Sequence, residues 1–294
     1  MALLVKDFKL LQPDHLTAGV HHIMAMSSEI FDNIAFEQIN SLTYKYNVME
    51  ELPNVEYRMI NGSYTEGVAE IKQTVEELCI FGGDVDVDVV LQYSSNLNDL
   101  RAIQVEAKTK ALMRRFDRDF FLGDGTSNSL KGLETRVAEG IAGTTVNGTI
   151  TGEKAVATEE LQLVYEVMSK VNKCTHLFMS QSTYVKFNMM LHNAGIRLIP
   201  TVDSFGRTVE MFNRAKVVAI DDALIKADKI YAVSLDKDCI RAVTSTGLQV
   251  RDLGELNTKP CYRTRIEMSI GIVTSHPKAF AILEAPSVLA KAKK

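Results

Sequence analysis

A long stretch without a helix breaker constrains this sequence most: neither Gly nor Pro occurs between Leu97 and Leu122. At 1.5 Å per residue, a helix of that length is about 39 Å long, roughly twice the length of an average globular helix. Asn96 or Asn98 can cap its amino end, and Gly123 suits its carboxyl end. We therefore predict one long helix, and any fold of this chain has to be built around it.

Two apolar stripes run along the predicted helix, and charged residues separate them. The first stripe follows three-and-four spacing and the second lies beside it. They consist of Ala102, Val105, Thr109, Leu112, Phe116 and Phe120, and of Leu100, Ile103, Ala107 and Ala111. One interpretation is a long core helix with a solvated face. The other is a strut against which different parts of the molecule, or neighbouring molecules, pack.

Asp84, Asp86 and Asp88 alternate with valines just before the helix, which predicts a strand with one apolar face. Three carboxylates on the other face could suggest a divalent-cation site. Along an extended strand, however, carboxylates two residues apart are separated by roughly 6.5 to 7 Å and point the same way, whereas the ligands of a calcium site converge from a tight loop. We therefore expect a solvated or arginine-facing strand edge and no metal site.

Residues 41–92 show a strand pattern around a polar interior. Tyr44 and Tyr46 alternate with polar residues, and the chain turns at Asn61 and Gly62, a pair that strongly indicates a hairpin. The interior contains few large hydrophobic residues. A hairpin of this composition has little core of its own and would be marginal in isolation.

The rest of the chain predicts a mixed α and β protein. Residues 1–40 are apolar and weakly helical without the pattern of a compact subdomain, so they must pack on the rest of the molecule or on a partner. After the long helix we predict two helices, over 158–172 and 182–194, and strands over 177–179, 215–220, 230–235, 240–243 and 263–273. Four side chains share one face of the last strand: Ile266, Met268, Ile270 and Ile272.

Composition and motifs argue against several functional classes. A net charge of −4, with both signs spread along the chain, gives no sign of an electrostatic nucleic-acid binder. No apolar run approaches the roughly 18 residues needed to span a bilayer. The four cysteines form no CxxC pair, which predicts reduced thiols and no zinc site. No phosphate loop, HExxH motif or nucleophile elbow occurs. We therefore predict no catalytic, cofactor-binding or metal-ligating residue, although an enzyme is not excluded.

The order of these parts resembles that of a tailed-bacteriophage major capsid protein. An apolar amino-terminal arm, a long polar hairpin, a strand ending in GGDVDVD and a long helix ending in FFLGDG follow one another. A helix, a short strand, a second helix ending in Gly and the segment YRTRIEMSIGIVTSHPKAFAIL come later. Each motif is weak alone, but their order and spacing cover nearly the whole chain.

The resemblance implies an α+β protein with the Hong Kong 97-like major capsid fold. In that fold neighbouring subunits would supply the other half of the contacts that the arm and the hairpin make. The implied parts are an N-terminal arm (1–40), the extended hairpin called the E-loop with its base strands (41–95), the spine helix of the peripheral or P domain (96–125), most of the axial or A domain (126–262), and the P-domain return strand with the C-terminus (263–294).

The implied function is structural and non-enzymatic. Hexamers and pentamers of the chain would form an icosahedral phage head, assembled in the host cytoplasm, that encloses double-stranded DNA and contacts it non-specifically. About 95 residues before the helix leave little room for an internal scaffold segment. We therefore expect a separate scaffolding protein, a portal and, as a further candidate, a decoration protein, with no membrane partner and no cofactor. The alternatives are an encapsulin-like nanocompartment shell and a soluble α+β enzyme.

The predicted assembly contacts fall into three groups: the hairpin tip, the spine arginines and the strand carboxylates. They are Tyr57, Arg58, Asn61, Gly62 and Tyr64; Arg114, Arg115 and Arg118; and Asp84, Asp86 and Asp88. We hypothesise that these arginines pair with these aspartates, within or between subunits.

Overall fold

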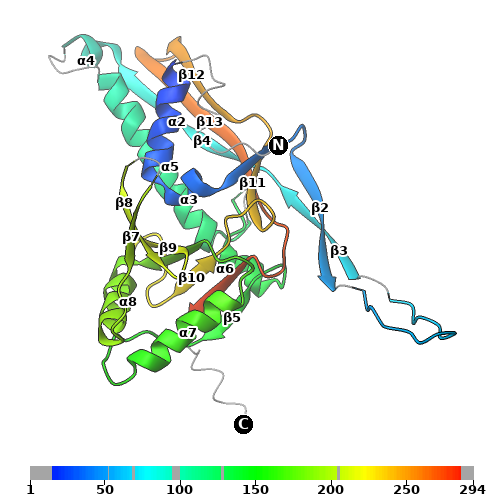
Figure 1. The fold of residues 1–294 in the computed structure, drawn as a ribbon. Helices are drawn as coiled ribbons and strands as arrows, with labels where there is room; N and C mark the ends of the chain where they lie inside the picture. The colour runs from blue at the N-terminus through cyan, green and yellow to red at the C-terminus, as the bar shows by residue number, and fades with distance from the viewer. Residues whose placement is uncertain are drawn as a thin grey trace.

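The computed structural model describes residues 15–51, 53–67, 70–94, 100–126, 129–203 and 206–285. Figure 1 shows two β-sheets, one above the other, a long helix that runs along the upper sheet toward the lower one, and a hairpin that projects from the side. The predicted long helix is confirmed as α5, Leu100–Leu122. Its expected caps, Asn96 and Asn98, lie outside the described residues. A short helix that we did not predict, α4 (Val89–Ser94), precedes it.

A five-stranded sheet lies beside α5. Its longest strand, β13, pairs with β4, β11 and β12, and β1 pairs with β11. The strands are β1 (Ala35–Gln38), β4 (Cys79–Asp88), β11 (Ile240–Thr244), β12 (Leu248–Glu255) and β13 (Cys261–Thr274). The apolar face predicted for β13 is confirmed, because Ile266, Met268, Ile270 and Ile272 are all buried.

The first predicted stripe of α5 faces the core, and the second does not. Val105, Thr109, Leu112, Phe116 and Phe120 are buried, whereas Ala102 is exposed. The second stripe does not pack within the described chain, since Ile103, Ala107 and Ala111 are exposed and Leu100 is half-buried. Packing of neighbouring molecules on this stripe stays a prediction. Met113, Asp117 and Phe121 are buried as well, so the buried face of α5 is wider than the first stripe.

The described part of the amino-terminal arm packs on its own chain. Helices α2 (His15–Ser27) and α3 (Glu29–Asn33) precede β1, and α2 lies along α5 in Figure 1. Phe31 is buried and meets Phe116 edge to face, with ring centroids 5.9 Å apart. Ser28 caps α3 by accepting from Phe31 N (3.1 Å). The described arm residues therefore have packing partners in their own chain, whereas the resemblance implied partners in neighbouring subunits.

A seven-stranded sheet forms the second layer, in the order β5–β14–β10–β6–β9–β8–β7. Helices α7 (Ala157–Ser169) and α8 (Gln181–Asn193) pack on it, close to their predicted bounds, and α6 (Leu133–Ala138) follows α5. The strands are β5 (Thr144–Asn147), β6 (His176–Ser180), β7 (Ile199–Val202), β8 (Thr208–Phe212), β9 (Ala215–Ile220), β10 (Ile230–Val233) and β14 (Phe280–Glu284).

Sheet membership does not change at residue 262, the predicted border between the axial domain and the return strand. β11 and β12 come before that border but belong to the five-stranded sheet, and β14 comes after it but lies inside the seven-stranded sheet. The chain therefore passes between the two layers several times. Neither β12 nor β14 was predicted.

Two glycines of the GGDVDVD motif allow close packing around β4. A Cβ at Gly82 would lie 2.3 Å from the backbone oxygen of Ile266 on β13. A Cβ at Gly83 would lie 2.4 Å from Cε of Lys108, whose side chain crosses the strand from α5. The first contact is with rigid backbone and the second with a flexible side chain, so only Gly82 is strictly required.

Among the described residues, no helix combines the length and the apolar character needed to cross a membrane.

Candidate assembly surfaces

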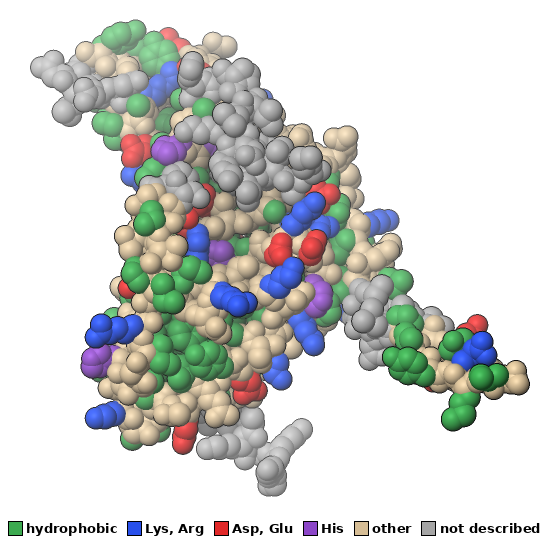
Figure 2. Space-filling view, in the orientation of Figure 1, with side chains coloured by type: hydrophobic (Ala, Val, Ile, Leu, Met, Phe, Trp, Pro, Cys, Tyr) green, Lys and Arg blue, Asp and Glu red, His purple; other side chains and the backbone are tan. Residues whose placement is uncertain are grey.

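The hairpin consists of β2 (Thr43–Glu51) and β3 (Glu70–Glu77), and residues 53–67 form its tip. Figure 2 shows hydrophobic side chains grouped at the far end of the hairpin. Tyr57, Met59 and Ile60 are 108%, 88% and 93% exposed, among the most exposed large hydrophobic side chains of the described chain. Nothing in the described part of the chain covers this apolar surface of the tip.

The five tip residues predicted from the sequence lie together. Asn61 has a positive φ of 67°, and Gly62 N donates to Met59 O (3.0 Å), as expected for a tight turn. Arg58 Nη1 donates to Gly62 O (3.2 Å), and its guanidinium lies 5.3 Å from the ring centroid of Tyr64. These contacts order the tip. Met59 and Ile60 were missed, although an apolar pair directly before Asn-Gly could have indicated them.

Of the two environments expected for the β4 carboxylates, solvated or arginine-facing, the structure shows the second, and the arginines come from β13. Arg265 donates to Asp84 through Nε and Nη2 (2.7 and 2.9 Å), and Arg263 donates to Asp86 in the same bidentate way (both 2.6 Å). These pairs face each other in the strand register. Bonding to the guanidinium lowers the pKa of each carboxyl. The third carboxylate, Asp88, accepts from Val90 N (2.8 Å) at the start of α4.

The spine arginines do not pair with those aspartates within the described chain. Arg114 contacts Asp221 (2.5 Å), Arg115 contacts Asp119 one turn away (2.6 Å), and Arg118 is exposed. The hypothesis of pairing within one subunit is therefore wrong. Val85 and Val87 turn inward, so the alternating aspartates point to the opposite face, away from the core. Pairing between subunits stays a prediction.

One buried ion pair at the base of the hairpin was missed. Arg136 of α6 is fully buried and pairs with the buried carboxylate of Glu76 on β3. No local pattern distinguishes this arginine from other charged residues of an amphipathic helix. Only the fold reveals the pair, because it brings Glu76 and Arg136, which are 60 residues apart in the sequence, into contact.

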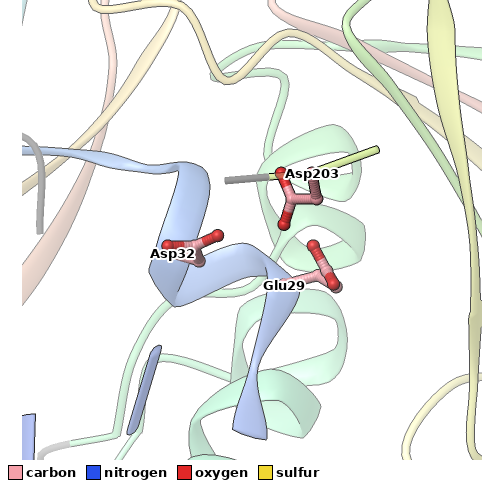
Figure 3. A group of neighbouring side chains, drawn as sticks. All are labelled: Glu29, Asp32 and Asp203. Carbon is pink, nitrogen blue, oxygen red and sulfur yellow. The ribbon is translucent and has the colours of Figure 1, made fainter. Parts of the chain in front are cut away.

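Three carboxylates meet where the arm reaches the seven-stranded sheet. Figure 3 shows Glu29 and Asp32 on α3 next to Asp203, which follows β7. Two cations already share this cluster: Arg207 contacts Glu29 (2.9 Å) and Asp203 (3.3 Å), and Lys216 contacts Asp203 (3.0 Å). Burial, followed by the charges of the neighbouring carboxylates, raises the pKa of Asp32 to about 6. The arrangement is that of an ion cluster tying the arm to the sheet.

Exposed apolar side chains also occur on two elements of the seven-stranded layer, helix α8 and the edge strand β7. Val185 and Met189 project from α8, and Ile199 and Val202 from β7, and all four are more than half exposed. β7 is the last strand of its sheet, with β8 on one side only. No motif in the sequence marks these residues, because isolated apolar side chains in a short helix and a short strand are ordinary core candidates.

The Phage capsid family matches residues 94–285, almost two thirds of the chain. No curated protein matches the chain. Among solved structures it is similar to a chain of Microbacterium phage Oxtober96, with 14% identity, coverage of 88% of this chain and 91% of that chain, and a TM-score of 0.64. It is similar to the capsid of a native GTA particle, with 13% identity, coverage of 90% and 91%, and a TM-score of 0.63.

A third similar structure is the holo-SrpI encapsulin complex from Synechococcus elongatus PCC 7942, with 15% identity, coverage of 85% and 84%, and a TM-score of 0.60. At these identities the likenesses establish the fold alone. They confirm the predicted α+β, Hong Kong 97-like fold, which phage capsids and an encapsulin share. The family match adds that the chain is a capsid protein. The chain belongs to the phage capsid family.

Proposed function

We propose that many copies of this chain self-assemble, through hexamers and pentamers, into an icosahedral phage head. The exposed hairpin tip carries this proposal. The hairpin is anchored in its own chain at the base, yet its far end presents Tyr57, Met59 and Ile60 to solvent. Clustered exposed apolar groups mark interaction sites. The partner that this tip fits is a second copy of the chain, since the fold is that of proteins that build shells.

The two layers correspond to the two domains of the fold. The five-stranded sheet with α5 is the P domain, and the seven-stranded sheet with α7 and α8 is the A domain, which would surround the hexamer and pentamer axes. The exposed apolar side chains of α8 and β7, Val185, Met189, Ile199 and Val202, suit contacts around such an axis. On the P domain, Arg118 and the exposed stripe of α5 are the candidate contacts between subunits.

The proposed content of the head is double-stranded DNA. The net charge of −4 suits a lining that does not hold packaged DNA tightly. Assembly takes place in the host cytoplasm with a separate scaffolding protein and a portal, and a decoration protein is a further candidate partner. The chain itself performs no catalysis in this scheme, and its predicted contacts act by packing and charge.

Substitution at the hairpin tip tests the proposed assembly. Ile60→Asp places a charge in the apolar surface that a neighbouring copy would cover, whereas Ser63→Asp places the same charge on a polar residue of the same tip. We expect Ile60→Asp to reduce the yield of closed particles at least about tenfold, since burying an unpaired charge in an interface costs more than 1.4 kcal/mol per contact. Equal yields from the two variants, measured by sedimentation and electron microscopy, would contradict the role of the tip.

An encapsulin-like shell is the second candidate, because the chain is also similar to the holo-SrpI encapsulin complex, with a TM-score of 0.60 against 0.64 for the phage structure. The content of the particle separates the two. Particles purified after expression with the neighbouring genes should contain double-stranded DNA that resists nuclease. Particles that contain a co-purified protein and no protected DNA would favour the nanocompartment.

A further inference from the structure

The hairpin meets the rest of the chain at a narrow root. Its apolar part is a small core in which Tyr46, Val48 and Leu78 pack against Val243 and Val273 of the five-stranded sheet. Apolar contacts are non-directional. They hold the root in place, but they do not by themselves fix the angle at which the hairpin leaves the body.

A buried ion pair between Arg136 and Glu76 fixes the angle at which the hairpin leaves the body. Arg136 Nη2 donates to Glu76 Oε1 on the hairpin, and three further bonds hold the same guanidinium to the body. Nε donates to Lys131 O (3.0 Å), Nη2 to Ile272 O (2.8 Å) and Nη1 to Thr274 Oγ1 (3.4 Å). The guanidinium is a rigid planar fork. The body therefore fixes the guanidinium, and the guanidinium fixes the carboxylate of β3.

A directional contact also exists on the other strand, but it lies nearer the surface. Arg241 Nη2 donates to the hydroxyl of Tyr44 on β2 (3.0 Å), and the guanidinium lies 5.6 Å from the Tyr44 ring centroid. Arg241 also contacts Glu37 (2.9 Å). Both residues are half-buried, whereas Arg136 is fully buried. Water competes less for a buried charge pair, so the pair at Glu76 dominates the orientation.

The length of the hairpin amplifies any change at its root. From Glu76 to the turn at Asn61 an extended chain spans up to roughly 50 Å, so a tilt of about 5° at the root moves the tip by about 4 Å. A displacement of that size exceeds what close-packed apolar side chains tolerate without losing contact. The root angle thus decides where the tip meets its partner.

We propose that Glu76 and Arg136, the root pair, set the angle of the hairpin and thereby the geometry at which one copy of the chain meets the next. This inference rests on the proposed shell function. Both residues are buried within their own chain and act through the hairpin, so both are positioning residues. A root that holds the hairpin within a narrow range of angles favours one particle size. A loosened root gives a spread of angles and particles of mixed size.

The test compares Glu76→Gln with Glu77→Gln. Glu77 is the next residue of β3, its side chain is exposed, and its substitution removes the same charge. Arg136→Lys, which keeps the charge but not the planar fork, is the second variant. Hydrogen exchange of the full chain, kept dilute and unassembled, reports on the root without any need for assembly. The reporters are the amides of β2 and β3 and the Leu78 N–H, which donates to Leu42 O (2.8 Å). Electron microscopy of assembled particles reports their size.

We expect Glu76→Gln to speed exchange at the root about tenfold or more, with β13 and α5 unchanged, because it leaves a buried guanidinium without its anion. Arg136→Lys should have a smaller effect in the same place, and Glu77→Gln none. Particles of Glu76→Gln should vary in size, and those of Glu77→Gln should match the wild type.

Unchanged exchange at the root in Glu76→Gln would overturn the proposal. Faster exchange over the whole chain would overturn it too, because the pair would then hold the fold in general and not the hairpin. If root exchange changes as expected but the wild-type chain forms no particles, the root pair stands and the shell function fails. Uniform wild-type-sized particles from Glu76→Gln, despite a loosened root, would contradict the link from hairpin angle to curvature.

Discussion

Replacing Asp117 by Asn should remove a pH-dependent loss of stability that arises where the arm contacts the long helix. Asp117 is 8% exposed, on the buried face of α5, and its Oδ1 accepts from the Ser28 hydroxyl (2.5 Å) that also caps α3. Burial, helped by the charge of Glu29, raises the pKa of Asp117 to about 7, although the bond from Ser28 opposes the shift. Asn keeps the acceptor and cannot ionise.

The sign of the effect follows from proton binding. Between about pH 4 and pH 7 the folded chain keeps a proton on Asp117 that the unfolded chain releases. The stabilising contribution is therefore fully present below about pH 4 and is lost as the pH rises through about 7. One pH unit corresponds to about 1.4 kcal/mol, so the unfolding free energy falls by up to about 4 kcal/mol from this group.

Urea unfolding of the unassembled chain, followed by circular dichroism at about pH 4.5 and pH 8, measures this contribution. Asp117→Asn should be close to wild type at the lower pH and more stable, by up to about 4 kcal/mol, at the higher one. Asp119→Asn is the control, because Asp119 lies on the same helix and pairs with Arg115. If wild type and Asp117→Asn lose stability in parallel as the pH rises, Asp117 is charged in the folded chain and the reasoning fails.

Two further predictions concern packing. Gly82→Ala should destabilise the chain by about 2 kcal/mol, because its Cβ would meet the backbone oxygen of Ile266, whereas Gly83→Ala should cost less than about 1 kcal/mol, because Lys108 can move. Equal melting temperatures for the two variants would contradict this difference. Phe116→Ala should cost about 3 to 5 kcal/mol, whereas Ile103→Ser, on the exposed stripe, should leave the unfolding free energy within about 0.5 kcal/mol of wild type and reduce particle yield. A destabilised Ile103→Ser chain would show that the stripe packs within the subunit.

The sequence predicts the elements that carry a strong local signal. The long helix is recognisable because no breaker interrupts it and its first stripe keeps helical spacing from Val105 to Phe120. The apolar face of β13 is recognisable because four side chains alternate from Ile266 to Ile272. In the same way, Asn61 and Gly62 mark the hairpin turn, which requires a positive φ. Short or ambiguous segments are lost: α4 has six residues, and the continuous apolar run of β14 fits a strand or a buried helix equally well.

Contacts between distant segments are much harder to predict. Periodicity indicates which faces of α5 are apolar but not what covers them, so it could not tell that the stripe at Ile103 is exposed in the single chain. The aspartates of β4 were expected to face either solvent or arginines. Naming Arg263 as the partner of Asp86 requires the register between β4 and β13, because the two residues are 177 positions apart in the sequence. The root pair has no local signal at all, since Glu76 and Arg136 each resemble ordinary surface charges.

The most direct test of the shell function is the structure of the assembled protein by electron cryomicroscopy. Expression of the full chain together with its neighbouring genes should give closed icosahedral particles. In these particles a neighbouring copy should cover Tyr57, Met59 and Ile60, which are exposed in the single chain. A compact monomer or dimer as the only species, with these three side chains still open to solvent, would contradict the proposed function.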